Sequence, residues 1–291
     1  MEVEQKRIIW LQGAGCTGCS ISVLNSVSPT IKNLLIDEVV PGQHLSLLFH
    51  PTIMAGSGEP VIEVMLDVRK EKGPYVLVVE GAVPTAGGGF FATVGEEDGR
   101  PVTLFSRFLT LAREASAIIA LGDCSSFGGI PAGRPNPTGC KGVKDILTDE
   151  KLDVPVINVS GCAPHPDWFV GTVAYLLLYG LPAPDQLDEL GRPKAFYGKL
   201  VHENCPRRPY FDEGKFARDL SEEGCLYEVG CKGPFTYADC PTRKWNNGVN
   251  WVVGAGSPCL GCTEPGFPDI CGPFYRKISD LEKVKPRINP R

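Results

Sequence analysis

Residues 7–20 of the 291-residue chain read RIIWLQGAGCTGCS, an apolar run that leads directly into a glycine-rich loop. The run over residues 7–12 shows no alternation of apolar and polar positions, which is typical of a strand buried on both faces of a parallel sheet. The loop places three glycines around a CxxC motif formed by Cys16 and Cys19. A helix is expected next, over residues 20–27. This order of strand, loop and helix is the opening of an α/β domain.

Four more apolar runs of the same kind follow. They are LSLLFH (45–50), YVLVVEG (75–81), SAIIALGDC (116–124) and VPVINVSGC (154–162). Helical patterns lie between or after them, at residues 102–115 and 167–180. Strands that alternate with helices predict a parallel sheet with helices on both faces. The sequence therefore predicts a flavodoxin-like, doubly wound domain over residues 1–195.

Residues 196–291 do not continue this pattern. Seven of the 12 cysteines lie between Cys205 and Cys271, among glycine, proline and aromatic residues. A segment with so little regular apolar pattern cannot build a core by burial alone. We expect a smaller, irregular domain that folds around bound metal, most simply iron–sulfur clusters.

Charge and hydropathy narrow the functional classes. The chain has 29 Lys and Arg against 34 Asp and Glu, a net charge of −5, so nucleic acid is not an expected partner. The longest apolar stretch, residues 168–181, is too short for a membrane span.

The start MEVEQKRIIW has neither a signal-peptide core nor twin arginines, which predicts a cytoplasmic protein, or a periplasmic one if the sequence is a processed form. In a reducing compartment cysteines serve metal or redox chemistry rather than disulfides.

Cysteines at three strand ends indicate a first metal site. Cys16 and Cys19 follow the first strand, Cys124 ends the fourth and Cys162 ends the fifth. The carboxyl ends of parallel strands share one edge of the sheet, where ligands bind. The sequence therefore predicts that these four thiolates meet there and hold a 4Fe-4S cluster.

The glycines of the first loop allow a competing interpretation. Gly13, Gly15 and Gly18 form a GxGxxG motif between a strand and a helix, as in dinucleotide-binding proteins. That motif needs an acidic residue at the end of the second strand, but the strand ends here in Phe49 and His50. A nucleotide-dependent oxidoreductase using this loop is thus the alternative. In the favoured interpretation the glycines bring backbone N–H groups close to a cluster.

Glu80 lies at the carboxyl end of the third strand, close to the predicted site. It is either a carboxylate that caps a loop or a group for proton relay or for a subunit interface.

Two further ligand groups occur in the second half. His202, Cys205, Cys225 and Cys231 form a quartet that suits a 4Fe-4S cluster or a zinc ion. Cys240, Cys259 and Cys262 form a set of three, which suits a 3Fe-4S cluster better than tetrahedral zinc. Cys140 and Cys271 have no assigned role and are expected to be small buried residues. A zinc-stabilised interaction module remains an alternative at this point.

Taken together, these residues resemble the small, electron-transferring subunit of nickel–iron hydrogenases. The shared motifs cover nearly the whole chain: WLQGAGCTGCSIS (10–22), EGAVPT (80–85), GDCSSFGG (122–129), NPTG (136–139), GCAPHPDW (161–168), HENCPRRPYFD (202–212), GCLYEVGCKGP (224–234), CPTRKWNNGVNW (240–251) and SPCLGCTEPGFPD (257–269). The resemblance implies a proximal 4Fe-4S cluster on Cys16, Cys19, Cys124 and Cys162. It implies a distal 4Fe-4S cluster on His202, Cys205, Cys225 and Cys231, and a medial 3Fe-4S cluster on Cys240, Cys259 and Cys262.

The chain departs from some members of that family. Oxygen-tolerant members carry two extra cysteines, at the positions of Gly18 and Gly129 here. Some relatives have a fourth medial cysteine, where this chain has Val252. The resemblance therefore implies an ordinary proximal cubane and a medial cluster of three irons.

The resemblance also implies a reaction and partners. Hydrogen would be cleaved reversibly to two protons and two electrons at a nickel–iron site on a separate large subunit, with which this chain forms a heterodimer. The chain would relay electrons through its clusters to, or from, an external acceptor or donor of unknown identity near His202. The related quinone-reductase subunit, which shares the first domain, explains the ligands after residue 200 less well.

Overall fold

The computed structural model describes residues 4–35, 43–70 and 73–277. The chain divides into two compact units, Met1–Ala183 and Pro184–Arg291. Among the described residues, no helix combines the length and the apolar character that a membrane span requires.

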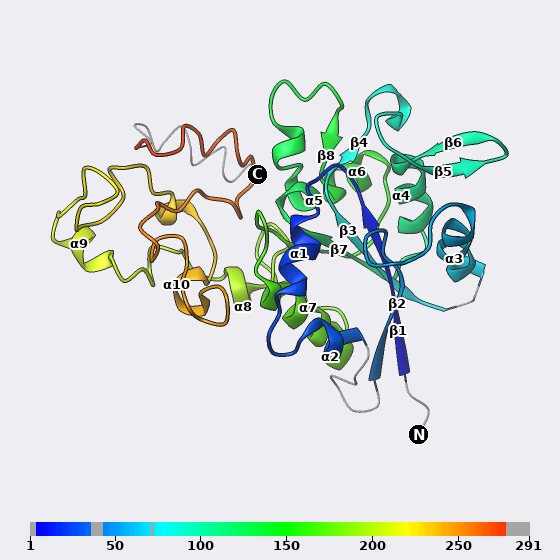
Figure 1. The fold of residues 1–291 in the computed structure, drawn as a ribbon, viewed down its shortest axis with the longest axis horizontal. Coiled ribbons are helices and arrows are strands. Elements are labelled where there is room, and N and C mark those ends of the chain that lie inside the picture. The colour runs from blue at the N-terminus through cyan, green and yellow to red at the C-terminus, as the bar shows by residue number, and fades with distance from the viewer. Residues whose placement is uncertain (1–3, 36–42, 71–72, 278–291) are drawn as a thin grey trace. The chain divides into compact units, whose positions relative to one another are not determined.

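The first unit is built on a five-stranded parallel sheet (Figure 1). Its strands are β1 (Glu4–Gln12), β2 (Gln43–Phe49), β3 (Tyr75–Glu80), β7 (Ala117–Leu121) and β9 (Val156–Val159). They pair in the order β2-β1-β3-β7-β9, which is the flavodoxin-like order. All five predicted strands are confirmed, and so is the predicted α/β class.

Burial on both faces explains why these strands could be predicted. Every residue of β7 is buried, and so are five of the six residues of β3. The register pairs Ile9 with Leu77, and Leu77 with Ile118. These branched side chains therefore lie side by side on one face of the sheet. An apolar residue at every position is what a covered parallel sheet requires.

Helices cover both faces of the sheet (Figure 1). Buried residues of α3, α4 and α6 pack with Ile9, Leu77 and Ile118 on one face, while α7 contributes Phe169 beside Trp10 on the other. The helices are α1 (Gly18–Leu24), α2 (Ile31–Leu35), α3 (Glu59–Lys70), α4 (Leu104–Ala112), α5 (Asp123–Phe127), α6 (Val143–Asp149) and α7 (Pro166–Tyr179). The predicted helices correspond to α1, α4 and α7. The other four were not predicted.

Short elements complete the first unit. They are the strands β4 (Val83–Pro84), β5 (Thr93–Glu97), β6 (Arg100–Thr103) and β8 (Cys140–Lys141), with the 3-10 turns η1 (Ala86–Gly89) and η2 (Ile130–Ala132). β4 pairs with β8 and β5 with β6, both antiparallel, outside the main sheet.

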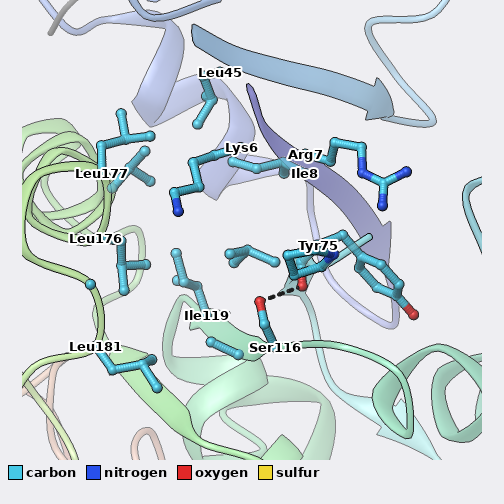
Figure 2. A pocket seen from close by; sticks show the side chains of 15 residues that line it. Lys6, Arg7, Ile8, Leu45, Tyr75, Ser116, Ile119, Leu176, Leu177 and Leu181 are labelled. Atoms are coloured by element: carbon cyan, nitrogen blue, oxygen red, sulfur yellow. Dashed lines mark hydrogen bonds between the residues drawn. The ribbon is translucent and has the colours of Figure 1, made fainter. Parts of the chain in front are cut away.

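An apolar pocket of about 290 Å³ lies at the amino ends of β1, β3 and β7. Figure 2 shows Leu176 and Leu177 of α7 among its lining, with Ile8 and Ile119 from the sheet. Ser116 closes one side by donating a hydrogen bond to the Tyr75 carbonyl over 2.8 Å. Because it lies at the amino ends of the strands, this pocket is remote from the predicted cysteine site at their carboxyl ends.

The second unit has little regular structure. It holds η3 (Pro184–Gln186), α8 (Lys194–Tyr197), α9 (Arg208–Asp212), η4 (Gly233–Phe235) and α10 (Cys240–Arg243). In its described part, backbone pairing between extended segments is limited to isolated bridges such as Phe216 with Cys225. This agrees with the smaller, irregular domain predicted from the sequence.

Candidate metal centres

The four proximal cysteines gather at the carboxyl edge of the sheet. Cys16 lies in the loop after β1 and Cys19 in the first turn of α1, whereas Cys124 begins α5 after β7 and Cys162 follows β9. Cys19 interacts electrostatically with each of the other three thiols. The structure therefore brings together all four residues that the sequence placed at this edge.

The chemistry of these thiols fits a metal cluster. Burial, and then Glu80 and the other three thiols, raise the pKa of Cys19 far above its ordinary value. Burial and Asp123 raise the pKa of Cys124 to about 12, and the same two causes raise the pKa of Cys162. Thiolates crowded in this way need a positive counter-charge, which coordinated iron supplies.

Within the described ranges, no three His, Cys, Asp or Glu side chains are arranged to hold a single metal ion. This is compatible with a cluster site, because each thiolate of a cubane binds a different iron atom. Four cluster ligands therefore stand further apart than four ligands of one ion.

Glycines leave room for the proximal thiols. A Cβ atom on Gly122 would collide with the Cys19 sulfur, and one on Gly18 would lie 3.0 Å from the Cys16 sulfur. A Cβ on Gly129 would lie 2.8 Å from the backbone nitrogen of Cys124. Gly18 and Gly129, where the resemblance places the extra cysteines of oxygen-tolerant relatives, both adjoin predicted ligands.

Glu80 is a buried acceptor that holds the start of α1. Its Oε1 accepts the backbone N–H groups of Cys19 and Ser20, over 3.1 and 3.0 Å. Its Oε2 accepts Trp10 Nε1 and Gln12 Nε2, each over 3.0 Å, and the Ser20 hydroxyl. The carboxylate thus caps the helix and fixes the backbone of one predicted ligand. A role in proton relay or at a subunit interface stays a prediction.

The glycine-rich loop packs against the loop that follows β3. The Gly13 N–H donates to the Glu80 carbonyl over 2.7 Å, and a Cβ at Gly13 would collide with the Ala82 carbonyl. After β2, where a dinucleotide site needs a carboxylate, His50 is buried with its Nε2 3.2 Å from the Ser20 hydroxyl. The close approach of two backbone segments accounts for Gly13 without a nucleotide.

The distal quartet also comes together. Cys225 and Cys231 interact electrostatically, as do Cys205 and each of these two thiols. The His202 N–H donates to the Gly233 carbonyl over 3.2 Å, and a Cβ on Gly233 would lie 3.4 Å from the Cys231 sulfur. Burial raises the pKa of all three thiols.

The environment of the His202 imidazole suits a metal ligand. Its Nε2 is buried and has no hydrogen-bond partner in the described part of the chain. Burial, followed by Arg208, lowers its pKa, which favours the neutral ring. The Phe211 ring meets the imidazole edge-on, with centroids 4.6 Å apart. A buried nitrogen without a hydrogen bond is costly, and coordination would satisfy it.

The medial group consists of three buried or half-buried thiols. Burial and then Cys262 raise the pKa of Cys240, while burial, Cys231, Cys262 and Cys240 raise that of Cys259. The Cys259 sulfur lies 3.7 Å from the Thr236 hydroxyl. Cys140 and Cys271, which had no assigned role, are both buried.

Two buried cations near these groups were not identified from the sequence. Arg192 is bound to Asp188 over 2.7 Å and to Glu264 over 3.1 Å, and it donates to the Thr263 carbonyl beside Cys262. Lys232 is buried next to Cys231. The only signal in the sequence was the position of Lys232 directly after Cys231, because nothing in a sequence marks a lysine or arginine as buried.

Comparison with known proteins gives consistent matches over both units. Residues 197–275 match the family described as the C-terminal part of the NiFe/NiFeSe hydrogenase small subunit, and residues 16–176 match NADH ubiquinone oxidoreductase, 20 Kd subunit. The chain is 47% identical to the periplasmic [NiFeSe] hydrogenase small subunit of Desulfomicrobium baculatum, covering 92% of this chain and 86% of that one. It is 44% identical to the periplasmic [NiFe] hydrogenase small subunit of Solidesulfovibrio fructosivorans, covering 93% and 81%.

Solved structures agree with these matches. A chain of the recombinant [NiFeSe] hydrogenase from Desulfovibrio vulgaris Hildenborough superposes with a TM-score of 0.87 at 42% identity, covering 94% of this chain and 98% of that one. A chain of the actinobacterial-type NiFe-hydrogenase from Ralstonia eutropha H16 gives a TM-score of 0.87 at 32% identity, covering 95% and 84%.

Proposed function

Because the chain belongs to the small-subunit family of nickel–iron and nickel–iron–selenium hydrogenases, we propose that it relays electrons through two 4Fe-4S clusters and one 3Fe-4S cluster. Members of this family are the electron-transfer subunits of an oxidoreductase, and each pairs with a large subunit that carries the nickel–iron site. The 20 Kd quinone-reductase family matches only residues 16–176, so it leaves the cysteine-rich second unit without an explanation.

The gathering of the predicted ligands into three separate groups carries the proposal. Cys16, Cys19, Cys124 and Cys162 would hold the proximal cluster, His202, Cys205, Cys225 and Cys231 the distal one, and Cys240, Cys259 and Cys262 the medial one. The clusters, when bound, supply one-electron transfer. The chain keeps the ligands in place: Glu80 holds the Cys19 amide, and glycines leave space for the proximal sulfurs.

The cellular location predicted from the sequence, the cytoplasm, is not supported by the relatives. The small subunits from D. baculatum and S. fructosivorans are both named periplasmic. We therefore propose the periplasmic alternative for this chain.

Metal analysis tests the cluster assignment directly. The enzyme is purified anaerobically with its large subunit, and its iron content is measured together with low-temperature EPR spectra. We expect about 11 cluster irons, from two cubanes and one three-iron cluster, and a three-iron signal after oxidation. A colourless protein that holds zinc in these sites would contradict the proposal. A medial cluster of four irons would contradict only the 3Fe-4S assignment.

Replacing His202 tests the distal site. His202→Ala removes one ligand, so we expect hydrogen oxidation with a dye acceptor to fall tenfold or more. Hydrogen–deuterium exchange at the nickel–iron site needs no electron to leave the enzyme and should be unchanged. Phe211→Leu, which removes the ring contacts with His202, Phe216 and Tyr227 but no proposed ligand, is the control and should keep its turnover. Unchanged dye reduction by His202→Ala would count against His202 as an exit ligand.

A further inference from the structure

Lys232 joins the distal and medial ligand groups of the second unit. It directly follows the distal residue Cys231, and its backbone N–H donates to the carbonyl of the medial residue Cys259 over 2.7 Å. The residue is only 2% exposed. Its Cβ would lie 3.4 Å from a Cβ built on Gly261, within the CxxC motif of Cys259 and Cys262. The lysine is therefore packed between residues of both groups.

Within the part of the chain that the structure describes, the hydrogen bonds of the Lys232 ammonium group go to neutral oxygen atoms. Its Nζ donates to the carbonyls of Gly230, over 2.8 Å, and Arg276, over 3.0 Å. Within the described residues, no carboxylate forms an ion pair with it, whereas the buried Arg107 has one carboxylate partner and the buried Arg192 has two. A buried cation is costly unless an anion compensates its charge. The fold therefore places a positive charge where an anion is expected nearby.

The nearby sulfur atoms identify that anion. Lys232 interacts electrostatically with Cys271, Cys231 and Cys259. The Cys271 thiol donates to the Gly261 carbonyl over 3.7 Å, and this residue belongs to none of the proposed ligand groups. Cys231 and Cys259 are proposed cluster ligands, and a ligating sulfur is a thiolate. Negative charge is thus expected on both sides of Lys232 once the clusters are bound.

We infer that Lys232 is the counter-cation shared by the distal and medial clusters, and that its charge raises the reduction potential of both. This inference rests on the proposed function. Reduction adds an electron to an already anionic cluster, and a fixed positive charge in a medium of low dielectric constant stabilises the reduced form. One side chain would in this way shift the potentials of two successive centres in the same direction.

Potentiometric titration of the whole enzyme, followed by EPR, tests this inference. In Lys232→Met the charge is lost while the side-chain length is nearly kept. At a fixed potential, we expect the ratio of reduced to oxidised cluster to fall about tenfold at both sites, which is about 59 mV for one electron. Lys232→Arg keeps the charge and should titrate like the wild type. Lys199→Met removes an exposed lysine of the same unit and is the matched control.

The outcomes distinguish the role inferred for Lys232 from the proposed electron-relay function. Clusters that are present in Lys232→Met with unchanged potentials would overturn the role of Lys232 and leave the proposed function intact. A wild-type enzyme without these clusters would overturn the proposed function itself. If Lys232→Met loses its iron, retention of iron by Lys232→Arg supports the need for charge. Loss of iron in both variants would contradict it, because shape rather than charge would then be required.

Discussion

Removal of iron is expected to unfold residues 184–277 while the sheet of the first unit stays folded. The second unit has no extended sheet among its described residues, and its helices α8, α9 and α10 have four, five and four residues. Helices this short are unstable on their own. The binding free energy of a structural metal site is on the order of 10 kcal/mol and acts as folding free energy. The second unit would lose this contribution from both of its proposed clusters.

The thiols add to this effect. Cys259 is buried and Cys240 is half-buried, and burial raises the pKa of both, so without iron these thiols are uncharged. The buried His202 Nε2, which has no hydrogen-bond partner among the described residues, would lose the metal proposed to satisfy it. The first unit differs, because a continuous apolar core formed by the sheet with α3, α4 and α6 remains after its cluster is lost.

Limited proteolysis with mass spectrometry measures this difference. After treatment with an iron chelator under reducing conditions, we expect new cleavage sites throughout residues 184–277. Peptides from β1, β3 and β7 should stay protected. Enzyme treated with the same chelator already saturated with iron is the control. A protected second unit would show that burial alone holds residues 184–277 together, and equal cleavage of both units would contradict the independent stability of the first.

Replacing Glu80 with alanine is expected to destabilise the first unit by about 3 kcal/mol or more. The substitution removes the acceptor of the Cys19 and Ser20 amides and of the Trp10 indole. Each buried donor left without a partner costs about 1–3 kcal/mol. Because the same bonds fix the start of α1, the proximal site should also lose occupancy, with cluster iron falling from about 11 toward about 7.

Two further variants isolate the cause. Glu80→Gln keeps one acceptor oxygen but turns an NH₂ group toward the donors, so an intermediate loss of stability is expected. Asp149→Asn removes a carboxylate from an exposed ion pair with Lys141 and should cost less than about 1 kcal/mol. Thermal unfolding and iron content of the intact enzyme measure both effects. A Glu80→Ala variant with wild-type stability and iron content would show that the carboxylate is dispensable.

The strands were predictable because their burial leaves a direct pattern in the sequence. β3 and β7 are apolar at nearly every position, since both of their faces are covered. The helix α3 (Glu59–Lys70) left a much weaker pattern. Met65 is its only fully buried residue among the described side chains, while Val64 is 43% exposed. A helix that buries so little has no clear apolar stripe to detect.

The ligand groups were predictable for a related reason. A parallel sheet brings the carboxyl ends of its strands to one edge, so the positions of Cys16, Cys124 and Cys162 along the chain were enough to group them. In the second unit, the many cysteines and the lack of an apolar pattern indicated metal binding. They did not show that Lys232 links the distal and medial ligand groups.

The sequence by itself thus determined the order of the strands along the chain and the edge at which the proximal cysteines meet, and it predicted that the second half needs metal. The three-dimensional packing decided the partners of single polar atoms. Glu80 accepts from groups that lie 60 to 70 residues earlier in the chain, and Lys232 meets a carbonyl of Cys259. Such contacts depend on how separate segments pack, and lysine and glutamate are ordinarily exposed. Their burial beside the ligands therefore arises only when the chain is folded.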